Sequence, residues 1–434
     1  MNWKKIKDIA LPIVTVLIIL SVTTVIIAYG RGYRFDFKQK TVLPIGVFTA
    51  TSDPTGAQIF IDGVKKSVTN TNINIDPGWY TVTIAKEGYQ PWEKKIRVQG
   101  EVVARADATL FPSNPSLYAI TSYGILAPTR SPDGMKIAYL VPTVEKDATS
   151  GAQLIRKEKA GLYVLDLVDK PLGLNRDAKR IILAETIPEI EKAIITWSPD
   201  SKQMLIDIPN KDTGFSKLYV LDADKLNDFA KPVSYKEALM KEWDDIRVAK
   251  EKEKLLALKE DLLNIATSSM HIIAFSPDET KILYEATATA TIPQILKPAL
   301  IGSNPTEETR TIRPGTLYIY DIKEDRNYPL GETTRYIKDE SVIATTKNKK
   351  VIPTNYTQLS ATIQWLPSSR HLIVVEKDRI DVMEYDGLNR TTVYAGPFWD
   401  SFVVPWTNAN RLVIVTNLNP KSGGLGTLYV VNIR

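Results

Sequence analysis

Two patterns of apolar residues divide the chain. Near its start, Ile9–Tyr29 is an apolar run of 21 residues that contains no charged side chain. Farther along, short runs of β-branched and aromatic residues alternate with clusters of Pro, Gly, Asp and Ser, which is the pattern of strands separated by turns. The sequence therefore predicts one apolar helix followed by a mainly β structure.

One strand-and-turn unit recurs five times at wide and uneven spacing. In each copy a strand ends, a turn follows, and two further apolar strands come after the turn. The three clearest turns are Ser131-Pro132-Asp133-Gly134, Ser198-Pro199-Asp200 and Ser276-Pro277-Asp278, and the two degenerate ones are Trp365-Leu366-Pro367-Ser368 and Trp406-Thr407-Asn408. Such repetition indicates a repeat architecture interrupted by long insertions.

The turn sequence has a mechanical explanation. Pro presets φ at the second turn position, Asp hydrogen-bonds its own backbone, and Gly tolerates the exit conformation. A fourth strand usually follows the unit, as at Arg180–Leu183 and Thr391–Tyr394. Four-stranded sheets repeated in series are the blades of a β-propeller. We therefore interpret the three recurring aspartates as turn residues and not as a ring of catalytic carboxylates.

The two ends of the repeat region predict a closed ring. The last unit stops at Arg434 after its third strand, whereas Ser116–Thr121 is a strand candidate that belongs to no unit. If the early strand completes the last blade, no sheet edge stays open. The prediction is five blades, or six if a degenerate blade lies within Tyr336–Tyr356.

The turn followed by Leu-Tyr-Val-Leu-Asp resembles the repeat of TolB-like β-propellers, also called WD-like repeats. The resemblance covers residues 113–434 and implies the propeller fold. It departs from the pattern at Arg130, where the other copies have Trp or Phe, and at Ser201 and Glu279, which replace the turn glycine.

The apolar run near the start predicts a membrane anchor. As a helix rising about 1.5 Å per residue, Ile9–Tyr29 would span roughly 30 Å of hydrocarbon. The run is longer than the apolar core of a signal peptide, and no convincing cleavage site follows it. We expect an uncleaved signal anchor at residues 9–29. A cleaved signal peptide and a buried helix are the alternatives.

Charge alone does not orient this anchor. Residues 1–8 form a basic tail, but residues 30–45 also carry cations, so the positive-inside count is nearly balanced. A single anchor with a long folded tail usually translocates that tail. We therefore expect a single-pass protein of the cell membrane with its C-terminal domains outside the cytoplasm. Residues 30–45 are expected to be a solvated linker, with contact to anionic lipid as the alternative.

Residues 46–112 form a separate module of about six short strands, the pattern of a small β-sandwich. Its spaced motifs are Pro54-Thr55-Gly56-Ala57, Asp62-Gly63, Pro77-Gly78 and Gly88-Tyr89. They resemble the PEGA domain family, with Thr55 at the position of the family's Glu. The resemblance implies an envelope-associated, non-catalytic module of bacteria and archaea, thought to bind surface glycans or proteins. No binding residue is carried over, because the matching positions are turn and core positions.

Three insertions interrupt the predicted propeller. Pro142–Ala160 and Thr287–Gly315 each separate the second and third strands of a blade, and such loops emerge on the same face as the loops between blades. Residues 234–263 lack Pro and Gly and approximate helical spacing, so one or two helices are expected there. Packing of these helices against their own blade is the simpler interpretation, and docking of a partner protein is the alternative.

Composition excludes several kinds of chemistry. The chain has no cysteine, which excludes disulfides, Cys-based zinc sites and thiol nucleophiles. Its net charge is only +5, with acids and bases interspersed, so nothing indicates nucleic acid. No serine-hydrolase, zinc-protease, phosphate-loop or dinucleotide motif occurs, and both histidines, His271 and His371, are expected in strands. We therefore expect no catalytic, metal-binding or cofactor-binding residue.

These observations favour a non-enzymatic platform of the cell envelope that recognises a protein or a surface polysaccharide. Binding function concentrates in loops held by a rigid scaffold, which here are the insertions. The alternative is a hydrolase acting on peptides or glycans in the central channel. Propellers of this type also precede peptidase domains, but this chain ends at Arg434. A purely structural spacer is a third class.

Overall fold

The chain forms two compact units in a computed structural model. The structure describes residues 3–30, 33–36, 41–44, 46–100, 102–146, 153–155, 157–169, 177–210, 214–336, 362–399, 402–418 and 425–434. One unit contains Met1–Leu110 with Pro298–Glu307, and the other contains Phe111–Lys297 with Glu308–Arg434. The sequence analysis predicted a boundary between residues 112 and 113. It did not predict that Pro298–Glu307, which is part of the insertion Thr287–Gly315, belongs to the first unit.

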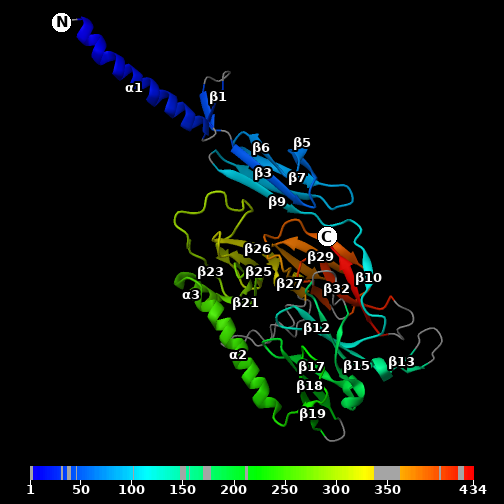
Figure 1. The fold of residues 1–434 in the computed structure, drawn as a ribbon. Coiled ribbons are helices and arrows are strands. Elements are labelled where there is room, and N and C mark those ends of the chain that lie inside the picture. The colour runs from blue at the N-terminus through cyan, green and yellow to red at the C-terminus, as the bar shows by residue number, and fades with distance from the viewer. Residues whose placement is uncertain are drawn as a thin grey trace. The chain divides into compact units, whose positions relative to one another are not determined.

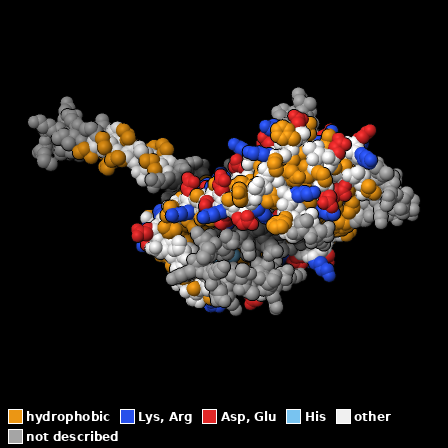
Figure 2. Space-filling view, turned by 90° about the horizontal axis from the view of Figure 1, so that it is seen from below, with side chains coloured by type: hydrophobic (Ala, Val, Ile, Leu, Met, Phe, Trp, Pro, Cys, Tyr) orange, Lys and Arg blue, Asp and Glu red, His pale blue; other side chains and the backbone are white. Residues whose placement is uncertain are grey.

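The first unit begins with helix α1, Trp3–Gly30. The side chains described on α1, residues 13–27, are all exposed, and the apolar ones among them are visible in Figure 2. Within the described part of the chain, no helix combines the length and the apolar character that a membrane crossing requires. The predicted linker contains a hairpin, in which β1 (Tyr33–Asp36) pairs antiparallel with β2 (Thr41–Pro44).

The module after α1 is a sandwich of two sheets, with strand orders β6-β3-β9 and β5-β4-β7-β8. The strands are β3 (Gly46–Asp53), β4 (Gln58–Ile61), β5 (Val64–Val68), β6 (Thr71–Ile75), β7 (Gly78–Ala85), β8 (Trp92–Val98) and β9 (Val103–Thr109). Apolar side chains of both sheets, including Phe48, Ile59 and Ile84, form one buried core. The sequence predicted about six strands and the structure describes seven; the side chains of β5 are largely polar and exposed.

The second unit contains five four-stranded antiparallel sheets, which we number as blades 1 to 5. Blade 1 contains β11 (Leu126–Arg130), β12 (Lys136–Val141), β15 (Gly161–Asp166) and β16 (Lys179–Leu183). Blade 2 contains β17 (Ile194–Trp197), β18 (Gln203–Pro209), β19 (Ser216–Asp222) and β20 (Lys231–Pro232). Blade 3 contains β21 (Met270–Phe275), β22 (Lys281–Ala286), β25 (Thr316–Asp321) and β26 (Arg326–Glu332). Blade 4 contains β27 (Ile363–Trp365), β28 (His371–Val375), β29 (Arg379–Glu384) and β30 (Thr391–Ala395). Blade 5 contains β31 (Val403–Pro405), β32 (Arg411–Thr416), β33 (Thr427–Asn432) and β10 (Leu117–Ala119).

Blade 5 is completed by a strand from the other end of the unit. β10 pairs antiparallel with β33, and the two lie together in Figure 1. The backbone N–H of Ile120 donates to the carbonyl of Leu428 at 2.8 Å, and that of Asn432 donates to Ser116 at 2.9 Å. The predicted closure by Ser116–Thr121 is therefore confirmed. The described residues give five blades; the possible sixth, within Tyr336–Tyr356, lies almost entirely outside them.

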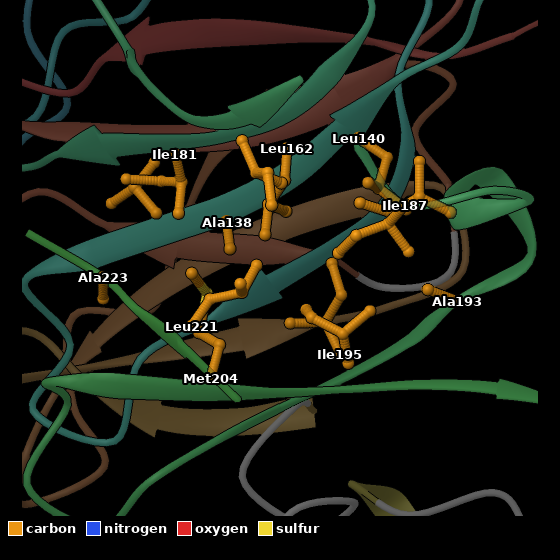
Figure 3. Packing of buried hydrophobic residues seen from close by; sticks show 14 of the residues in the cluster. Ala138, Leu140, Leu162, Ile181, Ile187, Ala193, Ile195, Met204, Leu221 and Ala223 are labelled. Carbon is orange, nitrogen blue, oxygen red and sulfur yellow. The ribbon is translucent and has the colours of Figure 1, made fainter. Parts of the chain in front are cut away.

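Apolar clusters join most neighbouring blades. One joins blades 1 and 2, where Leu140 and Leu162 meet Ile195 and Met204 (Figure 3). Others join blade 5 to 1, 3 to 4 and 4 to 5. Among the described residues, no such cluster joins blade 2 to blade 3, and the chain between them forms two helices, α2 (Lys236–Leu256) and α3 (Glu260–Ser269). The predicted helical insertion therefore extends to the start of β21.

The other two insertions carry hairpins of their own. In blade 1, β13 (Val144–Lys146) pairs with β14 (Gln153–Ile155), and in blade 3, β23 (Ala290–Thr291) pairs with β24 (Thr311–Ile312). Short 3-10 helices lie at Lys157–Lys159, Ala184–Thr186, Ile190–Lys192 and Thr333–Arg335.

Candidate functional site

The Ser-Pro-Asp residues of blades 1 to 3 hold their own turns. The serine hydroxyl donates to the aspartate two residues on, at 2.5 Å in Ser131–Asp133, 2.6 Å in Ser198–Asp200 and 2.7 Å in Ser276–Asp278. The same hydroxyl accepts from the backbone N–H five residues on, at 2.9 Å in each blade. Pro132, Pro199 and Pro277 occupy the second turn position between them. Each carboxylate therefore belongs to its own turn.

These hydrogen bonds stabilise the ionised carboxylates. The Ser198 hydroxyl lowers the pKa of Asp200. Burial alone would raise the pKa of Asp278, but hydrogen bonds from Ser276 and Thr280 outweigh it and lower that pKa to about 2. Both carboxylates are thus poised to accept hydrogen bonds at neutral pH, which suits a turn and not a general acid.

The exit residue of each turn has a positive φ in all five blades. The φ values are 72° at Gly134, 59° at Ser201, 57° at Glu279, 58° at Ser369 and 58° at Ala409. In blade 5 the N–H of Trp406 donates to Arg411, as that of Ser198 donates to Gln203 in blade 2. Trp406 therefore occupies the position of Ser198 and not that of the aromatic residue that precedes the turn in blades 2 to 4.

Two exit serines also join neighbouring blades. The hydroxyl of Ser201 accepts from the N–H of Asp133 at 3.1 Å, and that of Ser369 accepts from Asp278 at 3.0 Å. In the sequence, Ser201 is notable only because it replaces the turn glycine. Its contact with the neighbouring blade could not be predicted, because the partner Asp133 lies 68 residues earlier in the chain.

Arg130 joins blade 1 to blade 4. Its Nη1 donates to Oε1 of Gln364 at 2.9 Å, and Nε2 of Gln364 donates to the carbonyl of Val403 at 2.7 Å. Blade 5 lies between blades 4 and 1, so this bond joins the first strands of two blades that are not neighbours. Burial lowers the pKa of Arg130, with Asp133 opposing that effect.

The guanidinium of Arg130 also lies close to the glycine of blade 1. A Cβ at Gly134 would lie 2.3 Å from Nη2 of Arg130, and Gly134 also has a positive φ. The contact between Arg130 and Gln364 pairs a guanidinium with a neutral amide, which is a bridge between blades and not a nucleophile with a base.

The two histidines lie in strands, as expected. His271 on β21 faces Glu285 of β22, with 3.8 Å between Nδ1 and Oε2. His371 on β28 packs edge-on against Phe111, with 5.4 Å between the ring centroids. Among the described residues, no group of three or more His, Asp or Glu side chains could hold a metal ion.

The motif residues of the first unit serve its turns and core. Gly56, Gly63 and Gly88 adopt positive φ of 79°, 77° and 81°. Ala57 is fully buried, and its N–H donates to Thr69 Oγ1 at 3.0 Å.

The remaining motif residues make local contacts. Oδ1 of Asp62 accepts from the N–H of Thr81 at 2.8 Å. The carbonyl of Thr55 accepts from Lys86 Nζ at 2.6 Å, and the N–H of Tyr89 donates to the carbonyl of Lys86 at 3.1 Å. Pro54 lies between β3 and β4, while Pro77 and Gly78 lead into β7.

Helix α2 bridges blades 2 and 3, and one side of it, which includes Leu239 and Leu255, is half-buried. Lys236 forms an ion pair with Asp207 of β18, Lys250 donates to the carbonyl of Pro199 at 3.3 Å, and Lys254 Nζ lies 2.8 Å from Glu279. Trp243, 7% exposed, is its one buried side chain. By contrast, α3 buries Leu262 and Ala266 in the core of blade 3.

A shallow groove of about 570 Å³ runs along the outward side of α2. Its lining residues are Ala238, Lys241, Glu242, Asp245, Ile246 and Ala249. The apolar side chain of Ile246 is 41% exposed. An apolar strip flanked by both signs of charge can bind another protein surface.

Comparison with known proteins supports the division into two kinds of unit. Residues 45–114 match the PEGA domain family. None of the curated proteins matches the chain. Its PEGA-like module is therefore the part of the chain that a family model recognises.

Solved structures similar to the chain include TolB and other β-propellers. A putative TolB from Agrobacterium tumefaciens is 13% identical, with 69% of this chain and 76% of that chain covered and a TM-score of 0.19. The β-propeller domain of the Trilobed protease from Pyrococcus furiosus is 12% identical, with coverages of 89% and 95% and a TM-score of 0.19. An oligogalacturonate lyase in complex with manganese is 8% identical, with coverages of 90% and 97% and a TM-score of 0.25. At these TM-scores, no activity or site residue is carried over to this chain.

Proposed function

We propose that this protein is a membrane-anchored, non-enzymatic binding protein of the cell envelope, whose propeller docks a partner protein on the outward side of α2. The observation that carries the proposal is the groove on the outward side of α2, where Ile246 is 41% exposed between charged side chains. The opposite side of α2, which includes Leu239, Trp243 and Leu255, is buried or half-buried against the propeller.

The anchor is part of the same proposal. The uncharged run extends from Ile9 to Tyr29 in the sequence, and the side chains described on α1 cover residues 13–27 within it. Exposed apolar side chains on every side of a helix are typical of a segment surrounded by lipid. With this anchor, the propeller and the PEGA-like module would lie outside the cytoplasm.

A pull-down tests the docking surface. The full chain in detergent would be incubated with envelope proteins from cells that express it, and captured proteins would be identified by mass spectrometry. We expect capture by the native chain and loss of capture in Ile246→Glu/Ala249→Glu. The matched control is Leu256→Glu, because Leu256 is also apolar, lies on α2 and is 61% exposed but lies outside the groove. Equal capture by all three chains would contradict the proposal.

Protease accessibility tests the location. Protease added to cells with a permeabilised outer layer should digest the C-terminal domains while a cytoplasmic marker stays intact. Protection of those domains until the inner membrane is lysed would contradict the proposed orientation.

A further inference from the structure

We propose that the outer face of the sheet β5-β4-β7-β8 binds an acidic polysaccharide through Trp79, Lys95 and Arg97. This inference rests on the proposed function only in placing the module outside the cytoplasm. The residues involved belong to the first unit, whereas the α2 groove belongs to the second.

The three side chains lie together on one face. Trp79 of β7 is paired with Arg97 of β8, and the next pair on the same face is Thr81 with Lys95. Alternate residues of a strand share a face, and these four residues alternate with buried positions of the module's core. Trp79 is 50% exposed although it is among the largest apolar side chains of the module.

Two cations flank the indole ring without a carboxylate partner. Lys95 Nζ lies 5.6 Å and Arg97 Cζ 5.9 Å from the ring centroid. Among the described residues, neither cation takes part in an ion pair. The carboxylate of Glu93, on the same face, accepts from Thr83 Oγ1 at 2.9 Å. The face therefore presents a half-exposed indole ring with two cations over it.

This combination fits a uronic acid. The apolar face of a pyranose ring stacks on an aromatic side chain, and a guanidinium binds a carboxylate through paired hydrogen bonds. A uronic acid unit carries the ring and the carboxylate together, so one sugar can use Trp79 and a cation at once. A lipid phosphate offers charge but no sugar ring on which Trp79 could stack. The geometry thus favours the polysaccharide over the membrane surface.

Binding to immobilised alginate tests the inference. The full chain in detergent should bind alginate with an affinity that falls as salt rises, because the contact is ionic, and should not bind neutral dextran. Trp79→Ala and Lys95→Gln/Arg97→Gln should each weaken binding by about tenfold or more, as expected for central contact residues. Trp79→Phe should retain part of the affinity, because a smaller ring still stacks.

Arg105→Gln is the matched control. Arg105 is exposed on β9 in the other sheet, so the substitution removes the same charge from a different face and should change affinity by less than about twofold. An effect of Arg105→Gln as large as that of Lys95→Gln/Arg97→Gln would overturn the proposal, as would no binding to alginate. Tighter binding to single-stranded DNA or to phosphatidylglycerol vesicles would overturn it too.

Two further readouts distinguish a direct contact at Trp79 from a loss of folding and from binding through α2. Unchanged thermal unfolding of the variants would support a direct contact, whereas affinity lost only in proportion to unfolding would overturn it. Capture of a protein partner through α2 should be unaffected by Trp79→Ala. A failure of alginate binding therefore leaves the α2 result standing, and the reverse also holds.

Discussion

The residue at the exit of each repeat turn has a positive φ. In blades 2 and 4 its side chain also contacts the neighbouring blade. Ser201 has a positive φ of 59°, which is unfavourable for a side chain with a Cβ. Its hydroxyl compensates by accepting from Asp133 of the neighbouring blade at 3.1 Å. Serine occupies this position in blades 2 and 4, where its hydroxyl contacts the preceding blade, whereas Gly134, Glu279 and Ala409 occupy it in the other three blades.

Substitution of Ser201 separates these two effects. Ser201→Ala should destabilise the propeller by about 1 kcal/mol, because the N–H of Asp133 loses its acceptor while the strain remains. Ser201→Gly should be nearly neutral, because relief of about 1 kcal/mol of strain offsets the lost bond. Thermal unfolding of both variants measures the difference, and equal loss in the two would contradict this interpretation.

The free energy of unfolding should depend on pH through Asp278. Its pKa is lowered to about 2 in the folded protein from about 3.9 in an unfolded chain. A carboxylate with a depressed folded pKa contributes stability above the unfolded value, and that stability is lost as pH falls through the folded value. Asp278→Asn should therefore cost about 1 kcal/mol at pH 7, a figure discounted for partial exposure, and less at pH 2. A cost independent of pH between about 2 and 5 would contradict this assignment.

At the scale of elements, the seam between blades 2 and 3 differs from the other described seams. Apolar clusters join the other neighbouring blades, whereas here α2 makes polar contacts to both sides and buries Trp243. The sequence predicted the helices from their period, and the structure confirms two of them. It could not predict the outward position of Ile246, because the period identifies an apolar side but not which neighbour covers it.

Trp243→Ala should loosen α2 while the ring stays folded. The cost should be about 3 kcal/mol or less, the lower end for large aromatic truncations, because the helix is mostly exposed. Hydrogen exchange should accelerate in α2, β19 and β20, while β10 and β33 stay protected. Uniform acceleration throughout the propeller would show that α2 is part of the global core instead.

At the scale of the whole molecule, most of the fold was predictable because it repeats. Turn residues and strand periods recur, so a copy with a degenerate sequence can be recognised from the others. The closing strand was predicted because the last unit has three strands and Ser116–Thr121 belongs to no unit. The contact of Ser201 and the bridge from Arg130 to Gln364 were not predicted, because each depends on a partner that is distant in sequence. Trp79, Lys95 and Arg97 were not predicted as a group, because they come together only across two paired strands.

Closure of the ring by β10 is the central claim, because the insertions form one binding platform only if the blades are held in a circle. The chain lacks cysteine, so Ala119→Cys/Tyr429→Cys provides a clean test at residues that pair directly. Oxidation should cross-link the two strands in nearly all molecules and stabilise the protein by about 2–4 kcal/mol. The control pair Ala119→Cys/Lys231→Cys, on blades 5 and 2, should stay reduced. Free thiols at residues 119 and 429 after oxidation, in folded protein, would contradict the closed ring.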